Sequence, residues 1–287
     1  MTQSTERTMP ERPVEPLAAR VLRWGVLLVV LVPVVWSVLG LELSWSRIAR
    51  APGLLWAILS DMVPPDFDDW TTSLDAVMDS LYIAWLGTII GAAGSFVLAF
   101  VAARNLTPRP VSAAARFILS AIRAFPELLL AILFIPVVGL GPFAGVLAIG
   151  IHSIGTLGKL SGEVIESVDD GPLEALDAVG GTWIQRTRWG VLPQVLPEIV
   201  AYWLYRFEIN IRASAVLGII GAGGIGDRLV GLLRFRDFPK AGTVLLLTIV
   251  TVLIVDAVSA RVRRRIITGR WSSPRQAVVT PPVAVTT

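Results

Sequence analysis

The sequence predicts an all-α membrane protein with about six transmembrane helices. Of its 287 residues, 54% are hydrophobic before the 25 glycines are counted, and only 16% are charged. Soluble domains have about 45–50% apolar residues with glycine included, and about 25% charged residues. A soluble fold of this size could not bury so much apolar surface. The apolar residues also gather in uncharged stretches long enough to cross a bilayer, with charged segments between them.

The same composition excludes several classes of function. The chain has no cysteine and a single histidine, His152, so disulfides, thiolate metal sites and multi-histidine metal sites are excluded. No G-x-x-x-x-G-K-[ST] motif occurs, so the chain itself does not bind ATP through a P-loop. We therefore expect no metal, no cofactor and no enzymatic activity in this chain. The net charge of +3 reflects basic loops at a bilayer rather than nucleic-acid binding.

The N-terminal quarter divides into a tail, a first span and an external segment. Residues 1–20 are polar and proline-containing, and are predicted to form a disordered cytoplasmic tail. Within residues 21–70, Trp24–Leu41 forms a retained first transmembrane helix, because no small-x-small cleavage site follows it. A helix near Arg47–Met62 is expected to lie at the membrane interface.

Residues 71–265 are predicted to form the membrane core, followed by a cytoplasmic tail over residues 266–287. A polar loop at about 163–197 interrupts this core and cannot lie in hydrocarbon. The remaining five spans are expected at 80–103, 116–138, 142–157, 199–220 and 241–260.

The distribution of basic residues fixes the predicted orientation. With both termini inside, sixteen Lys and Arg residues fall on inner segments, six on outer segments and three within spans. The positive-inside rule then places both termini in the cytoplasm.

A glycine-rich segment satisfies the pattern of a dinucleotide-binding loop. That fingerprint requires a preceding strand and a parallel sheet, whereas here an apolar helix precedes it on the outer side. We interpret the segment as a turn or gate with close backbone packing, formed by Gly221, Gly223, Gly224 and Gly226.

The polar loop carries a short amphipathic helix. Glu174 lies near its positive end, while Leu173, Leu176 and Val179 recur at three-residue spacing and give it an apolar face. Gly180 then ends the helix. Such a helix suits the groove of a partner protein; the alternative is a helix folded back on the membrane surface.

This loop resembles the EAA motif of bacterial ABC importer permeases. The pattern is E-A-A, three residues, G, nine residues, an aliphatic residue, x-L-P. Leu176 replaces the third small residue and Gly190 the aliphatic one, while five positions match: Glu174, Ala175, Gly180, Leu192 and Pro193. With segments 123–127, 152–160 and 208–218, the chain resembles the phosphonate ABC-transporter permease family.

The resemblance implies a type I ABC importer permease-like bundle in the bacterial plasma (inner) membrane. It implies a homodimer that binds two cytoplasmic ATPase subunits, which carry ATP and Mg, and an external phosphonate-binding protein. The ATPase-coupling residues would be Glu174, Ala175, Leu176, Gly180, Leu192 and Pro193.

Polar side chains within the spans mark a candidate substrate pathway, because ionisable groups are costly in a bilayer. Arg123 with Glu127, and Glu208 with Arg212, are four residues apart, so each pair could meet on one helix face. The alternative is that each pair is structural. The pathway candidates are Arg123, Glu127, His152, Glu208, Asn210 and Arg212.

Two further polar features accompany these candidates. Pro126 is expected to free the carbonyl of Ile122 and to kink the third span. Lys159 and Glu163 are expected to form a solvated pair where the fourth span leaves the membrane.

The function favoured by these features is import of phosphonate or a related phosphorus oxyanion. The alternatives are an ABC permease for another solute such as methionine, an ion-coupled secondary transporter, and a membrane enzyme. Co-purification of an ATPase subunit would separate the ABC permease from the last two.

Overall fold

The computed structural model describes residues 17–41 and 44–268, and within them the fold is helical throughout. The predicted all-α class is therefore confirmed. The chain divides into two compact units, residues 1–59 and 60–287. The first holds α1 (Leu17–Gly40) and most of α2 (Trp45–Asp61). α1 is long and apolar enough to span a membrane.

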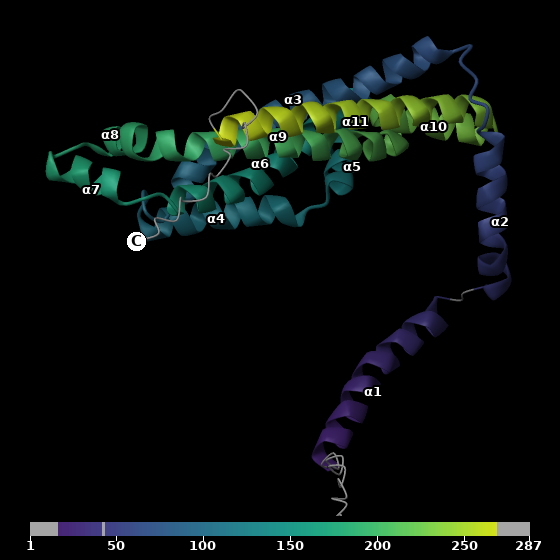
Figure 1. Ribbon diagram of the computed structural model, residues 1–287, viewed down its shortest axis with the longest axis horizontal. Helices are drawn as coiled ribbons and strands as arrows, with labels where there is room; N and C mark the ends of the chain where they lie inside the picture. Colours follow the sequence, from purple (N-terminus) through teal and green to yellow (C-terminus); the bar gives the residue numbers. More distant parts are fainter. Residues whose placement is uncertain (1–16, 42–43, 269–287) are drawn as a thin grey trace, which may run out of the picture. The chain divides into compact units, whose positions relative to one another are not determined.

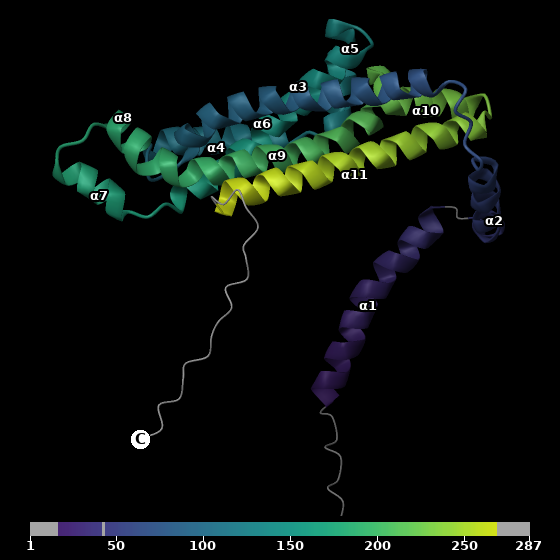
Figure 2. The same cartoon turned by 45° about the horizontal axis from the view of Figure 1, so that its top comes forward.

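Four long helices form the body of the second unit and run side by side (Figures 1 and 2). They are α3 (Trp70–Ala102), α6 (Pro142–Glu166), α9 (Leu192–Leu217) and α11 (Phe238–Thr268). α3 and α6 approach closely because small residues line their interface. A Cβ atom at Gly87 would lie 2.6 Å from Ile149 Cγ2, and one at Gly91 would clash with Ser153 Cβ. Small residues at such crossings are typical of helix packing in membranes.

Two of the predicted spans are bent. α4 (Arg109–Ala124) and α5 (Glu127–Val138) meet at 87°, and α9 is followed, through the π-helical turn η2 (Gly218–Ala222), by α10 (Gly224–Arg234) at 57°. The described chain therefore contains four uninterrupted candidate spans, and six only if each bent pair counts as one.

Several predicted boundaries need correction. The third span is not one helix over 116–138, because Pro126 lacks the N–H that would continue α4. The fourth does not end near residue 157, since α6 continues to Glu166. Residues 1–16, 42–43 and 269–287, which include most of both predicted tails, lie outside the described residues.

The loop between α6 and α9 is itself helical. It contains α7 (Gly171–Ala178), α8 (Trp183–Gln185) and a π-helical turn, η1 (Arg186–Val191), which continues directly into α9. Figure 1 shows α7 and α8 at one end of the helical body. Leu173 of α7 and Val191 of η1 are buried in one apolar cluster with Ile165 and Ile199, so this loop is packed onto the ends of α6 and α9.

Candidate functional site

A buried ion-pair network lies where α5, α6 and α9 meet. The Glu127 carboxylate, in the first turn of α5, pairs with the Arg206 guanidinium of α9. Its Oε1 also lies 2.8 Å from His152 Nδ1 on α6. Arg206 Nη2 lies 2.8 Å from the same His152 nitrogen, which can donate to Glu127 or accept from Arg206 but not both at once. Arg206 is only 6% exposed, so its charge depends on these partners.

Neutral side chains extend this network to α3. Arg206 Nε donates to Ser153 Oγ at 3.0 Å. The Asn210 amide donates to Ser153 Oγ at 3.2 Å and to Thr88 Oγ1 at 2.9 Å. Asn210 is fully buried, and its Oδ1 has no hydrogen-bond partner among the described residues. The central network, as we call residues Thr88, Glu127, His152, Ser153, Arg206 and Asn210, thus joins α3, α5, α6 and α9.

The predicted pairing of Arg123 with Glu127 is wrong. The α4–α5 bend places the two residues on different helices, and Glu127 points to Arg206 instead. Arg123 is exposed in the last turn of α4 and forms no ion pair within residues 44–268. The carbonyl of Ile122 is not free either, because it accepts a hydrogen bond from the Phe125 N–H at 3.3 Å.

The predicted pairing of Glu208 with Arg212 is also wrong, because both side chains turn to α11. Arg212 Nη2 donates to both carboxylate oxygens of Asp256, at 3.1 and 3.0 Å. Glu208 Oε1 lies 3.5 Å from Arg263 Nη2 and makes no hydrogen bond there. Two ion pairs therefore connect α9 to α11 instead of bridging turns of α9.

Sequence reasoning missed Arg206, Ser153 and Thr88 as members of the central network. Arg206 precedes Asn210 by four residues, so the two share a helix face, and this spacing was the available signal. No comparable signal identifies Ser153 or Thr88, since hydroxyl side chains are common in membrane helices. The candidates Glu127, His152 and Asn210 do lie together, whereas Arg123, Glu208 and Arg212 lie outside this network.

α7 presents a polar and small surface to its surroundings. Glu174 and Ala175 are exposed, while Leu173 is buried and Leu176 half-buried. The predicted apolar face is shorter than expected, because Val179 lies beyond the helix end and is 80% exposed. The outward surface thus includes Glu174, Ala175 and the turn that follows.

That turn depends on glycine. Gly180 has φ 73°, in the left-handed region, and the Gly181 N–H donates to the Leu176 carbonyl at 2.8 Å, which closes the helix. Gly190, on η1, packs beneath α7, where a Cβ would lie 2.8 Å from Leu173 Cδ2 and 3.2 Å from Leu176 Cδ1. Leu176, the large residue in the third motif position, is therefore accommodated by Gly190, which replaces the aliphatic residue of the motif.

The remaining motif positions lie at the start of α9. Pro193 occupies the first turn of that helix and is exposed, and Leu192 is half-buried. Because η1 runs directly into α9, the proline stands inside a continuous helical segment, directly after the π-helical turn. α7 and these two residues belong to one packed segment.

The glycine-rich segment forms the tight turn between α9 and α10 and packs against α3. We call this turn the glycine-rich corner. Gly221, Gly223 and Gly224 have φ values of 89°, 76° and 74°. The Ile225 N–H donates to Ser80 Oγ at 2.9 Å, and a Cβ at Gly226 would clash with the Ala215 carbonyl. A helix precedes the segment, so the context of a dinucleotide loop is missing.

The start of α3 is held to α10 by one ion pair. Thr72 Oγ1 donates to the Asp69 carboxylate, which also pairs with Arg228 of α10. The Thr72 hydrogen bond and the Arg228 guanidinium lower the pKa of Asp69.

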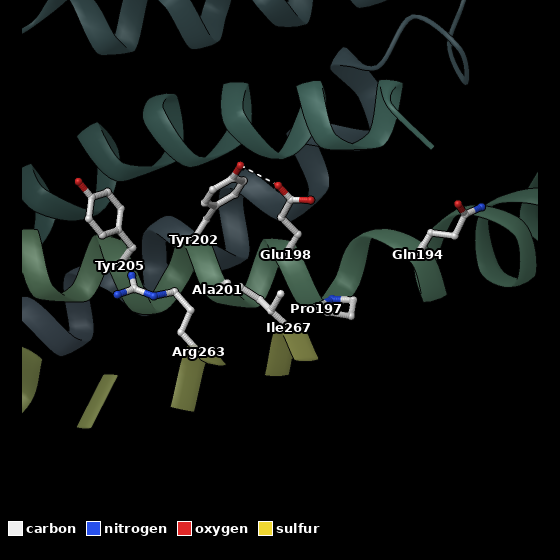
Figure 3. A pocket seen from close by; sticks show the side chains of 8 residues that line it. All are labelled: Gln194, Pro197, Glu198, Ala201, Tyr202, Tyr205, Arg263 and Ile267. Atoms are coloured by element: carbon white, nitrogen blue, oxygen red, sulfur yellow. Dashed lines mark hydrogen bonds between the residues drawn. The ribbon is translucent and has the colours of Figure 1, made fainter. Parts of the chain in front are cut away.

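A separate cavity of about 540 Å³ lies between α9 and the end of α11 (Figure 3). Tyr202 donates to the Glu198 carboxylate at 2.9 Å across its wall, and the Arg263 guanidinium lies 5.7 Å from the centre of the Tyr205 ring. None of the predicted pathway residues lines it.

Known proteins with similar sequences include permeases named for phosphite and phosphate transport. The chain is 43% identical to the phosphite transport system permease protein PtxC of Stutzerimonas stutzeri, over 72% of this chain and 76% of that protein. It is 40% identical to the phosphate-import permease protein PhnE of Mycolicibacterium smegmatis, over 76% of this chain and 41% of that protein.

Solved structures show the same fold at lower identity. An inward-facing MetNI methionine ABC transporter matches with a TM-score of 0.58 and 22% identity, over 67% of this chain and 95% of that one. A bacterial alginate ABC transporter matches with a TM-score of 0.59 and 16% identity, over 87% and 98%. The type I importer permease fold is thereby confirmed.

The model of the binding-protein-dependent transport system inner membrane component family matches residues 95–268. This range contains α7, the glycine-rich corner and every residue of the central network except Thr88. The chain therefore belongs to this family, and relatives that share 40–43% of its residues are permeases named for phosphite and phosphate transport.

Proposed function

We propose that this chain is the transmembrane subunit of an ATP-driven importer for phosphorus oxyanions such as phosphonate, phosphite or phosphate. The observation that carries the proposal is the identity of 40–43% to permeases named for phosphite and phosphate import. A buried arginine network is compatible with such a cargo, because a guanidinium suits tetrahedral oxyanions.

The proposed assembly contains two copies of the chain in the plasma membrane, with both termini in the cytoplasm. Two cytoplasmic ATPase subunits supply ATP and Mg, and an external phosphonate-binding protein delivers the solute. The chain needs no cofactor of its own for this role.

The coupling role belongs to α7. Movement of an ATPase subunit acts on the surface that contains Glu174, Ala175 and the Gly180 turn. Because Leu173 is buried against η1 and α9, this movement is passed to the start of α9, where Leu192 and Pro193 lie. Arg206 and Asn210 are further along the same helix, so the central network would respond to the ATPase. The glycine-rich corner that follows α9 is a candidate outer gate.

The proposal is tested by reconstituting the chain with its ATPase subunits and binding protein and measuring uptake of phosphite and methylphosphonate. Gly180→Asp is expected to leave insertion intact and to reduce both ATPase association and uptake, because it places a charge and a side chain at the docking turn. Gly231→Asp is the matched control, since that glycine lies on α10 with open space around it. Normal uptake by Gly180→Asp would refute the coupling role. If the unaltered chain takes up neither these two solutes nor inorganic phosphate, the proposed cargo is refuted.

A further inference from the structure

A second, smaller cavity lies between α3, α4 and α6, away from the central network. Its volume is about 130 Å³, and its wall includes Arg116, Leu119 and Ser120 of α4 with Gly158, Lys159 and Gly162 of α6. Lys159 follows His152 by seven residues on α6, which is about 10 Å along the helix. The cavity therefore lies toward the end of α6 that leads to α7.

Two glycines make this space. A Cβ at Gly158 would lie 2.6 Å from Leu119 Cδ2, so only a glycine allows α4 and α6 to approach here. At Gly162 a Cβ would lie 3.6 Å from the Ala99 carbonyl, in ordinary contact. Gly158 thus sets the close approach of the two helices, and the missing side chain at Gly162 leaves the space open beside α3.

The Arg116 guanidinium is fixed in position. Its Nε donates to the Ala102 carbonyl at 3.0 Å and its Nη2 pairs with Glu166. The same Glu166 oxygen accepts the Arg104 N–H at 2.6 Å, so the carboxylate is also held. These contacts use Nε and Nη2, and leave the Nη1 donors for another acceptor.

Lys159 carries the unbalanced charge of the cavity. The sequence predicts that it pairs with Glu163, yet within residues 44–268 Lys159 forms no ion pair. Glu166 offsets the charge of Arg116, so the ammonium of Lys159 leaves the cavity with a net positive charge. The three ammonium donors of Lys159, the Nη1 group of Arg116 and the Ser120 hydroxyl all belong to residues that line the cavity, where Lys159 and Ser120 are exposed.

We propose that this cavity binds a phosphate-type oxyanion. A guest with several acceptor oxygens and one or two negative charges matches these donors, because the neighbouring Glu166 carboxylate is already paired with Arg116 and the Lys159 charge is not offset. Two sources share this chemistry: a free inorganic oxyanion, or the headgroup of an anionic phospholipid. The site goes beyond the proposed function, because it would hold the same ligand if the transported solute were a different one.

The test measures binding to the full-length chain in two arms. In the first, the protein in phosphatidylcholine nanodiscs is titrated with inorganic phosphate by calorimetry. In the second, the protein is purified in phosphate-free detergent with phosphatidylglycerol, and the retained lipid is counted by native mass spectrometry. Lys159→Gln and Ser120→Ala alter the cavity, and Lys159→Arg keeps its charge. Arg109→Gln is the control, because it removes one charge from α4 outside the cavity.

Lys159→Gln is expected to weaken binding about tenfold in one arm. Ser120→Ala is expected to weaken it less, and Lys159→Arg is expected to bind nearly as tightly as the unaltered chain. Loss in the first arm identifies a free oxyanion, and loss in the second identifies a lipid headgroup. Unchanged binding in both arms, or an equal loss in Arg109→Gln, would overturn the proposal. Neither readout involves transport, so failure here and failure of the proposed function are distinguishable.

Discussion

Arg206 illustrates how a charged residue is kept inside this bundle. Its guanidinium is enclosed by Glu127, His152 and Ser153, and each contact comes from a helix other than its own. The desolvation cost of the ion pair is offset only while these partners remain in place. These contacts thus hold α5, α6 and α9 together beside the α4–α5 break.

Removing one partner of this pair should be more harmful than removing both charges. Arg206→Ala leaves the partly buried Glu127 carboxylate with the His152 hydrogen bond but without its arginine partner, and is expected to cost about 3 kcal/mol of stability. The double variant Arg206→Gln with Glu127→Gln should recover much of that loss. The stability of both variants is measured by heating the detergent-solubilised protein and monitoring the folded fraction by size-exclusion chromatography. A double variant as unstable as Arg206→Ala would show that the charges themselves are required.

Arg212 differs from Arg206, because its side chain is 53% exposed and that of its partner Asp256 is 37% exposed. Removing both partners together strands no single charge within the spans. Arg212→Gln with Asp256→Asn should therefore preserve folding and assembly. If Arg212 lines the anion path, this double variant loses uptake at normal abundance in membranes. Normal uptake would assign the pair a purely structural role, and Arg212→Lys tests whether charge alone suffices.

The observed ion pairs differ from the predicted ones for a physical reason. Four-residue spacing shows which side chains can meet on one helix, but a long arginine side chain can also reach a neighbouring helix. Arg212 pairs with Asp256 of α11, and Glu208 lies next to Arg263 of the same helix. Only tertiary packing reveals these partners. Periodicity and hydropathy were sufficient for the helical class and the order of spans, whereas the partners of buried charges depend on how the helices face one another.

At the scale of elements, α7 and η1 behave as one unit. Gly190 leaves room for Leu173 and Leu176, so two departures from the EAA pattern compensate each other. The motif could be recognised from the sequence, but this compensation could not, because the two positions lie fourteen residues apart and meet only across the helix–turn packing.

This packing predicts a coupled pair of substitutions. Gly190→Ile is expected to push α7 away from η1, because its side chain collides with Leu173 and Leu176, and so to weaken ATPase association. Adding Leu176→Ala should partly restore association, since it removes one of the two obstacles and leaves the nearer one, Leu173. A double-mutant cycle on co-purified ATPase measures the coupling, expected at about 0.5–3 kcal/mol. Additive losses would indicate that the two positions do not compensate.

At the scale of the whole molecule, one chain carries one α7. An importer with two ATPase subunits needs two such helices, and a two-fold dimer supplies the second with a pathway at the symmetry axis. Native mass measurement of the reconstituted complex is expected to find two copies of this chain. One copy paired with a different permease would contradict the homodimer.

The break between α4 and α5 also has a consequence for biogenesis. The two helices have 16 and 12 residues, about 24 and 18 Å, so neither alone crosses about 30 Å of hydrocarbon. Glu127 is synthesised first, and Arg206 lies 79 residues further along the chain. At about 5–20 residues per second, the ribosome needs roughly 4–16 s to deliver that partner. During this interval the nascent chain must leave α5 at the bilayer surface or insert Glu127 as the neutral acid, and synthesis of α9 completes the insertion.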